Sequence, residues 1–220
     1  MIESIGRRLR VVFGLATAPD DAAAIAPPRE TSRSSQQVEF VAYGEDCVLS
    51  GVVHLASDRL TDMLNDHDEY QLVDVLVESL AGEPAVEVQE VLVHRDELLL
   101  IHATGPRGNL GRRHRTRSHP VAIQIGPYHI RGYLHALPGA DPVQAIRRRK
   151  PMVPLTDAWI EFGTAARRQR RRVGTVVVNR EQIDWIVPAV DDEVEMPDMP
   201  LSAEKGRLTK DFTGALFEGL

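Results

Sequence analysis

The chain has 220 residues, of which 43% are hydrophobic, 26% charged and 5% aromatic. This composition is typical of a folded globular protein and excludes a fibrous or wholly disordered chain, and no run approaches the roughly 20 apolar residues of a membrane-spanning helix. The single cysteine, Cys47, excludes an internal disulfide framework and favours a reducing compartment, so we expect a cytoplasmic location.

The net charge of −6 conceals two oppositely charged halves. Residues 1–105 carry 7 basic and 19 acidic side chains, residues 106–190 carry 16 and 5, and residues 191–220 carry 3 and 8. Such segregation does not determine a fold, but it bears on which partners the chain attracts and in which orientation.

The first 37 residues are interpreted as an N-terminal segment and linker. Arginines followed by the apolar run Val11–Ala16 could imitate a secretory signal, but the run is short and Glu3 precedes it. We therefore expect a short amphipathic helix, followed by a linker rich in Ala, Pro and Ser over residues 18–37.

An internal duplication is indicated between residues 38 and 190 by three blocks that align in the same order. Cys47–Leu55 aligns with Tyr128–Ala136, Leu72–Glu78 with Leu155–Glu161, and Val91–Leu98 with Val176–Ile183, at offsets of 81, 83 and 85 residues. The predicted organisation is an acidic β repeat at 38–105, a basic linker at 106–118, a basic β repeat at 119–190, and an acidic linker with a possible C-terminal helix at 191–220.

Each repeat is predicted to hold about five strands, because apolar residues alternate with polar ones between turn signals. In the third strand, Val73, Val75 and Val77, or Thr156, Ala158 and Ile160, are expected to face the core, with Asp74 or Asp157 on the opposite face. Residues 94–97 and 179–182 are interpreted as hairpin connections to the last strand.

One short helix is expected in each repeat. In the first, Ser57 or Asp58 would cap a helix whose apolar stripe is Leu60, Met63 and Leu64, and Asn65 would end it in a left-handed conformation. In the second, Asp141 would cap a helix that begins at Pro142. The predicted fold class is therefore mainly β, with two tandem small units, each a β-barrel or sandwich.

Several motifs resemble those of a family of small, uncharacterised bacterial β-domains. Arg59–Asn65 resembles the family signature R-L-[ST]-D-x-L-N, while Val153–Ala158 and Val178–Arg180 resemble its P-L-T-D-A and V-N-R blocks. Each repeat departs from the pattern in a different place, so the chain resembles two degenerate tandem copies. The resemblance implies a small mixed β-domain in a bacterial protein and brings no activity or catalytic residue.

No catalytic, cofactor or metal site is predicted from the remaining motifs, and a non-enzymatic protein is expected. Asp74 and Glu78 are four positions apart on a strand, roughly 13 Å, which is too far for a pair of glycosidase carboxylates. His54 and His135 occupy equivalent positions but have no partner ligands at metal-site spacing. Cys47 opens an apolar strand beside acidic residues, which favours a core position over a reactive thiolate.

Three basic clusters are the strongest candidates for binding a partner or an anion. They are Arg112, Arg113, Arg115 and Arg117; Arg147, Arg148, Arg149 and Lys150; and Arg167, Arg168, Arg170, Arg171 and Arg172. The favoured interpretation is an interaction or assembly module, in which the acidic repeat meets the basic repeat of the same or another chain, or a protein partner does so. The alternative is nucleic-acid binding through the arginines, against which stand the lack of aromatic residues within the clusters and of a recognition helix.

Overall fold

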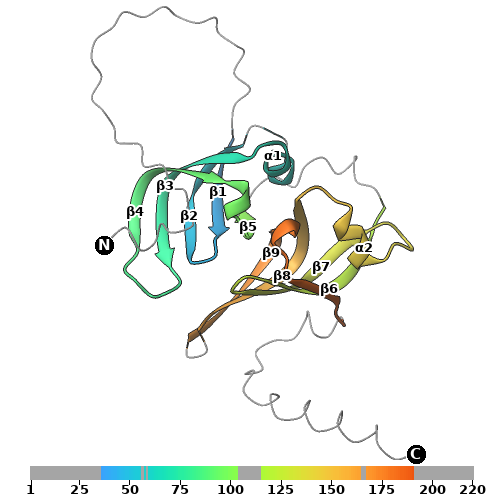
Figure 1. Cartoon of the computed structure of the whole chain (residues 1–220). Coiled ribbons are helices and arrows are strands. Elements are labelled where there is room, and N and C mark those ends of the chain that lie inside the picture. The colour runs from blue at the N-terminus through green and yellow to red at the C-terminus, as the bar shows by residue number, and fades with distance from the viewer. Residues whose placement is uncertain (1–35, 56, 58, 104–114, 165–166, 191–220) are drawn as a thin grey trace, which may run out of the picture.

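The structure, a computed structural model, describes residues 36–55, 57, 59–103, 115–164 and 167–190 (Figure 1). The expected N-terminal helix, the expected C-terminal helix and the side chains of Arg112 and Arg113 lie outside these residues. Within the described residues the protein is mainly β, as predicted.

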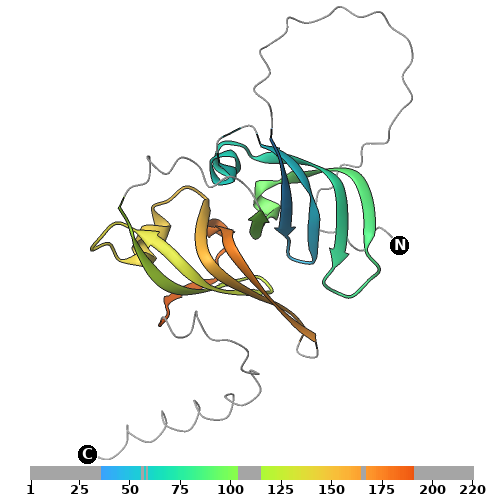
Figure 2. The same cartoon turned by 180° about the vertical axis from the view of Figure 1, so that it is seen from behind.

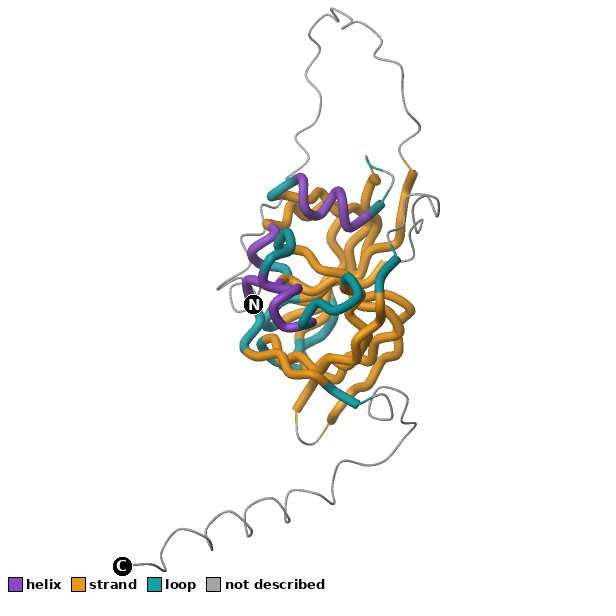
Figure 3. Tube along the Cα trace, turned by 90° about the vertical axis from the view of Figure 1, so that its right-hand side faces the viewer, coloured by secondary structure: helices purple, strands orange, loops and turns teal. Residues whose placement is uncertain are grey.

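The elements fall into two groups, which we call the first and the second unit. The first unit contains β1 (Gln36–Tyr43), β2 (Cys47–Leu55), α1 (Leu60–Asp66), β3 (Glu69–Ser79), β4 (Val86–His94), the 3₁₀ turn η1 (Arg95–Glu97) and β5 (Leu100–Ala103). The second contains β6 (Arg117–Ile125), β7 (Tyr128–Ala136), α2 (Pro142–Arg147), β8 (Met152–Thr164), β9 (Arg167–Asn179), the 3₁₀ turn η3 (Arg180–Gln182) and β10 (Trp185–Pro188). Figure 3 shows how short the helices are beside the strands.

All the strands belong to one antiparallel sheet with the order β10-β6-β7-β8-β9-β5-β1-β2-β3-β4. The sheet is strongly curved in each unit, and the two units lie side by side (Figures 1 and 2). It is not closed into a barrel, because β10 and β4 remain as its two edges. Of the two expected forms, barrel or sandwich, a closed barrel is therefore wrong. Strand β5 does not pair with β4 of its own unit but with β1 and with β9 of the second unit.

The same strand order and pairing occur in both units. Strands β5-β1-β2-β3-β4 of the first unit correspond to β10-β6-β7-β8-β9 of the second. Phe40 pairs with Gly51, and the residues 81 positions later, Val121 and Gly132, also pair. The same holds at the offsets of 83 and 85 residues. Glu69 pairs with His94 in the first unit, and their counterparts Met152 and Asn179 pair in the second.

The third strand of each unit is irregular at the same place. The register between β2 and β3 shifts between Ser50 and Val52, and that between β7 and β8 shifts between Arg131 and Tyr133. Glycine is required there, because a Cβ on Gly51 would lie 2.9 Å from the carbonyl oxygen of Val73.

Two aspartates complete this irregularity with left-handed backbone. Asp74 has φ 52° and Asp157 has φ 47°, a conformation that aspartate adopts more readily than most residues. The left-handed residue bends the strand and interrupts the expected alternation of inward-facing and outward-facing side chains. Leu72 and Val75 are consequently buried while Val73 is only half-buried, so the predicted core set of Val73, Val75 and Val77 is wrong in part.

Helix α2 begins as predicted, whereas α1 has the predicted apolar stripe but not a cap by Ser57, and Asp58 lies outside the described residues. Leu60, Met63 and Leu64 are buried on α1, which confirms the apolar stripe, and the Asp141 carboxylate accepts a hydrogen bond from the Val143 N–H at 2.9 Å to cap α2. Arg59 is the N-cap of α1 and makes no side-chain cap, while the Ser57 hydroxyl donates to the Arg59 carbonyl. The expected left-handed end at Asn65 is wrong: α1 continues to Asp66, and His67, with extended backbone, is its C-cap.

The expected hairpins at residues 94–97 and 179–182 are also wrong. His94 and Asn179 end β4 and β9, the residues that follow them form η1 and η3, and the strands on either side of each turn do not pair with one another. The turns carry the chain across the unit, so that β5 pairs with β1 and β10 pairs with β6. Each last strand thus lies on the opposite side of its unit from the strand before it.

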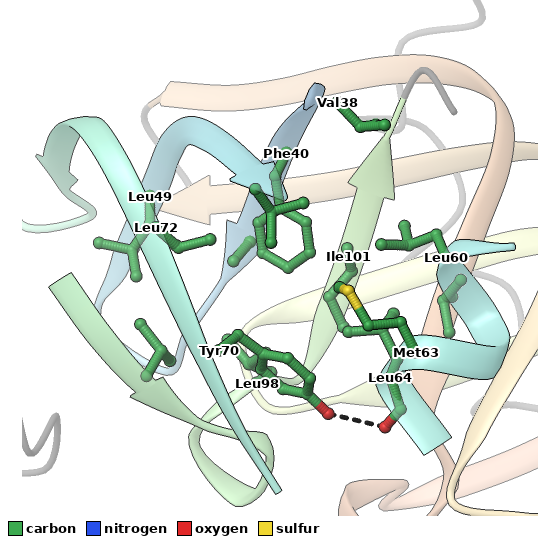
Figure 4. Packing of buried hydrophobic residues seen from close by; sticks show 14 of the residues in the cluster. Val38, Phe40, Leu49, Leu60, Met63, Leu64, Tyr70, Leu72, Leu98 and Ile101 are labelled. Atoms are coloured by element: carbon green, nitrogen blue, oxygen red, sulfur yellow. Dashed lines mark hydrogen bonds between the residues drawn. The ribbon is translucent and has the colours of Figure 1, made fainter. Parts of the chain in front are cut away.

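Two hydrophobic clusters fill the units, and each takes residues from both. The first, shown in Figure 4, packs α1 and Tyr70 against the inner faces of the first unit's strands, and Tyr70 donates a hydrogen bond to the Leu64 carbonyl at 2.7 Å. It also includes Met152 and Val177 of the second unit. The second cluster includes Tyr43, Val48, Leu99 and Leu100 of the first unit.

We call the contact between β5 and β9, with the side chains around it, the inter-unit junction. Its register pairs Leu100 with Val178, Ile101 with Val177 and His102 with Val176. Tyr43 and Tyr128 pack edge to face with ring centroids 5.5 Å apart, and Phe162 lies 5.7 Å from Tyr128. The Tyr128 hydroxyl donates to the Gly44 carbonyl at 2.7 Å. The junction is therefore built like a protein core and holds the units as one body.

Candidate interaction surfaces

The predicted basic clusters do not form one patch, because the fold places them at two ends of the second unit. Arg117 begins β6 opposite Ala136, the last residue of β7, and Arg115 is exposed just before it. The Arg149 guanidinium donates to the carbonyl of His135, next to the same strand end, and burial lowers the pKa of Arg149. The described members of the linker cluster, Arg115 and Arg117, therefore lie towards the same end of the second unit as α2, where Arg147 and Arg148 end the helix.

The third cluster lies on the hairpin formed by β8 and β9, which projects beyond the rest of the second unit (Figures 1 and 2). Its members point to different faces of the strand. Arg171 lies opposite Ile160, on the face of the junction, and donates to the Tyr43 hydroxyl at 3.1 Å. Arg168 is exposed, and of Arg167 only the backbone in β9 is described. Arg171 is thus structural, whereas Arg170 and Arg172 occupy the outer face.

On that outer face the two arginines flank an aromatic ring. The guanidinium carbons of Arg170 and Arg172 each lie 5.7 Å from the ring centre of Trp159, within the range of a cation–π contact. Arg170 also forms an ion pair with Glu161. No aromatic residue lies within the basic clusters along the sequence, but the fold places Trp159 beside the third cluster, where it pairs directly with Arg172 across the hairpin.

A second aromatic contact continues this face towards β10. The His129 ring lies 5.8 Å from that of Trp185 at the edge of the sheet. Burial lowers the pKa of His129, and the charge of Arg131 adds to this effect, so the neutral imidazole is favoured. Sequence reasoning could have found these neighbours only by pairing the strands first, because the residues are far apart along the chain.

An ion pair near α1 joins the acidic first unit to the basic second unit. Lys150 Nζ lies 2.9 Å from the Asp66 carboxylate. Beside it, the Asn65 amide donates to the Met152 carbonyl at 2.9 Å and its oxygen accepts from the Met152 N–H at 3.0 Å. The end of α1 is thereby fixed to the beginning of β8.

The residues that were weighed as catalytic candidates do not come together in one site. Asp74 is exposed at the irregular turn of β3, and His54 is exposed on β2. The His135 Nε2 atom lies 2.7 Å from the Thr156 hydroxyl. Cys47 is buried, and burial beside Asp46 raises its pKa to about 12, so it is a core residue as predicted. The described residues contain no group of three or more side chains placed to hold a metal ion.

The two edge strands of the sheet carry three of the large exposed apolar side chains of the described residues. Among the described residues, the large exposed apolar side chains are Val86, Leu137, Trp185, Val187 and Val190. Val86 is on β4, and Trp185 and Val187 are on β10, the other edge. Edges that expose both backbone groups and apolar side chains are typical sites for pairing with another chain.

Within the described part of the chain, no helix is long and apolar enough to cross a bilayer. Comparisons with protein-family models, with curated proteins and with solved structures find no match to this sequence. The function therefore has to be argued from these surfaces.

Proposed function

We propose that this protein is a non-enzymatic assembly module that joins copies of its own chain, and that its two units are tandem copies of one β-domain related to the bacterial family suggested by the motifs. The single cysteine, buried in the first unit, agrees with a cytoplasmic site of action. Support for the duplication comes from the equivalent pairings, the shared irregularity at Gly51 and Gly132, and the left-handed aspartates in both units.

The observation that carries the proposal is the inter-unit junction. One unit binds the other there by strand pairing and by side chains that enter both cores. A domain whose copies bind one another inside a chain has the surfaces needed to bind copies in other chains. Because the contact uses different surfaces of the two units, its repetition would be head-to-tail, the type of contact that builds rings or filaments.

The segregated charges give such contacts an orientation. Copies that meet with the acidic unit of one facing the basic unit of the next attract, whereas like units repel. Exposed charges act over about 8 Å at physiological ionic strength and over less at higher salt. Assembly should consequently weaken as salt is added.

Sedimentation of the full chain tests this function. At about 20 mM salt, the average mass should rise with protein concentration, and at about 500 mM it should fall towards that of one chain. Replacement of both Arg147 and Arg148 by glutamate should weaken assembly. Replacement of the hairpin residues Arg168 and Arg172 by glutamate changes the net charge by the same amount and is the matched control. A mass of one chain at all concentrations in low salt would exclude the proposal.

Binding of single-stranded nucleic acid is a second candidate function, favoured by the outer face around Trp159. Arginines on either side of a half-buried ring can hold phosphates while a base stacks on its outer face, an arrangement that binds single strands with little sequence preference. The acidic first unit opposes this function, which is why we place it second.

An oligonucleotide titration distinguishes the two functions. If this face binds nucleic acid, Trp159→Ala should weaken the binding of a fluorescent oligothymidine by about 1–3 kcal/mol, and Arg172→Gln should reduce the salt dependence. Val86→Ala, on β4 of the acidic first unit, serves as the control. Equal binding by all variants would show attraction to any polyanion, and no binding in low salt would remove this candidate.

A further inference from the structure

We infer that β4 of one copy pairs with β10 of the next copy, in the register that β9 and β5 use at the inter-unit junction. This inference rests on the proposed function and names the surfaces that perform it. Its starting point is the sheet order, in which the two joined strands, β9 and β5, correspond to the two edge strands, β4 and β10. Each free edge is the counterpart of a strand that already binds its complement.

The register follows from the two offsets that relate the units in these strands. Residues of β9 correspond to residues of β4 that lie 85 positions earlier, and residues of β5 to residues of β10 that lie 85 positions later. The three pairs of the junction, Leu100–Val178, Ile101–Val177 and His102–Val176, therefore have three counterparts between copies. They are Trp185 with Val93, Ile186 with Leu92, and Val187 with Val91, and all six side chains are apolar.

The backbone groups at both edges point in the required directions. At the junction, the Asn179 N–H donates to the Leu99 carbonyl at 3.0 Å. On β4, the Arg95 N–H donates to Asp68 at 2.7 Å, and because antiparallel bonds alternate, the backbone groups of Leu92 point away from β3. On β10, the Ala189 N–H donates to Pro120 at 2.9 Å, which directs Ile186 away from β6 in the same way.

Pro188 does not prevent this pairing, although proline on an edge strand blocks it where a donor is needed. Its counterpart in the first unit is Ala103, which pairs with β1 but lies beyond the three pairs with β9. The proline would thus limit the contact to the same three pairs.

On β4, Val91 and Val93 already belong to the first cluster, each 1% exposed, whereas the Trp185 and Val187 side chains of β10 are exposed. At the junction, Leu100 enters the cluster of the second unit and Ile101 that of the first. In a contact between copies, Trp185 would take the place of Leu100 and lie against the first cluster beside Val93. That cluster ends at Val77 and Val88, which are only partly buried. Trp185 is 43% exposed in the single chain, so its burial would supply much of the driving force.

The charges near this contact are complementary. At the junction, the end of α1 meets the beginning of β8 through Asp66 and Lys150. The counterparts between copies are the end of α2 and the beginning of β3. Arg147 and Arg148 of one copy would then approach Asp68 and Glu69 of the next, with the signs reversed relative to the junction. This is the contact on which the expected salt dependence rests.

The contact between copies should be weaker than the junction. Tyr43, Tyr128 and Phe162 pack together at the junction, and their counterparts are Gln124, Cys47 and Ser79. The aromatic cluster is thus absent from the predicted contact, as is the buried Asn179, whose counterpart is His94. Assembly should accordingly be reversible and depend on concentration, whereas the junction is permanent.

Two proline variants test the proposal through their mixture. Leu92→Pro removes the outward N–H of β4, and Ile186→Pro removes that of β10; neither N–H is used by the neighbouring strand of its own chain. In low salt, each variant should sediment as one chain, and an equimolar mixture should form a species of two chains, because each supplies the edge that the other lacks. Formation of this species also shows that both variants are folded. Leu137→Ser, which changes the exposed apolar residue away from both edges, should assemble as the wild type does.

A cross-link between copies measures the register independently of the proline variants. Val91 and Val187 would form a pair without backbone bonds, whose α-carbons lie about 4.5 Å apart, within the range of a disulfide. The double variant Val91→Cys, Val187→Cys should give disulfide-linked oligomers on mild oxidation. The control Glu87→Cys, Val187→Cys should give at least about tenfold less, because those positions are not opposed.

The outcomes separate this inference from the proposed function. If the wild type assembles and both proline variants assemble equally well without the cross-link, the edges are not the contact, although assembly stands. Dimerisation of one variant alone would indicate a symmetric contact and would also overturn the inference. A wild type that stays as one chain in low salt would overturn both proposals, and would indicate that the edges are covered by another part of the same chain.

Discussion

Replacement of Tyr128 by alanine is expected to lower the free energy of unfolding by about 3–5 kcal/mol, the range for removing a large aromatic side chain from a core. Tyr128 is fully buried and contacts Tyr43 and Phe162 at the inter-unit junction. Its loss would leave a cavity between the units and would also leave the Gly44 carbonyl without its donor. Denaturant unfolding followed by circular dichroism measures the effect.

Tyr128→Phe is the matched control, because it keeps the ring and removes only the hydroxyl. The loss of the single hydrogen bond to Gly44 should cost about 1–2 kcal/mol. Both variants should unfold in one transition, since the two hydrophobic clusters share residues across the junction. Two separate unfolding transitions would contradict the interpretation of the junction as a core. So would an alanine variant whose free energy of unfolding lies within about 1 kcal/mol of that of the wild type.

Asn179 is expected to give the second large effect, with a loss of about 2–4 kcal/mol for Asn179→Leu, because several buried groups lose their partners. Its amide nitrogen donates to the Leu98 carbonyl at 3.1 Å and to the Arg95 carbonyl at 3.3 Å, and its oxygen accepts from the Glu181 N–H at 3.2 Å. The side chain is completely buried and connects η1 of the first unit to η3 of the second. Leucine has a similar volume but satisfies none of these groups.

His94 occupies the same place in the first unit and provides the control. It is half-exposed and contacts Glu69 at 2.8 Å on the surface. His94→Leu should change the free energy of unfolding by less than about 0.5 kcal/mol, as is usual for exposed positions. The same unfolding experiment measures both variants. Equal losses of free energy of unfolding at the two positions would show that the effect at Asn179 does not come from its burial between the units.

Much of the secondary structure could be predicted because it follows from local patterns. The alternation in β6 and β7, the apolar stripe of α1 and the Asp141 cap of α2 all depend on residues close together in the sequence. The aligned blocks also predicted which residues occupy equivalent positions. Local patterns failed at Asp74 and Asp157, because a left-handed residue within a strand leaves no signal in an apolar alternation.

The arrangement of the strands could not be predicted, for a physical reason. Whether a last strand pairs with the strand before it, closes a barrel or joins a neighbouring unit depends on contacts between residues far apart in the chain. The same limit applies to the candidate surfaces. Trp159 was not associated with the arginines because its closeness to Arg170 and Arg172 arises only from the pairing of β8 with β9.

The position of β5 has a consequence for synthesis on the ribosome. The strand is complete at Ala103, but β9, which covers it, begins only at Arg167. While the intervening residues are translated, the nascent first unit presents an uncovered strand and the apolar side chains of Tyr43 and Leu100. Neighbouring nascent chains on one messenger RNA could exchange their second units at this stage, giving a domain-swapped dimer with every contact of the single chain preserved.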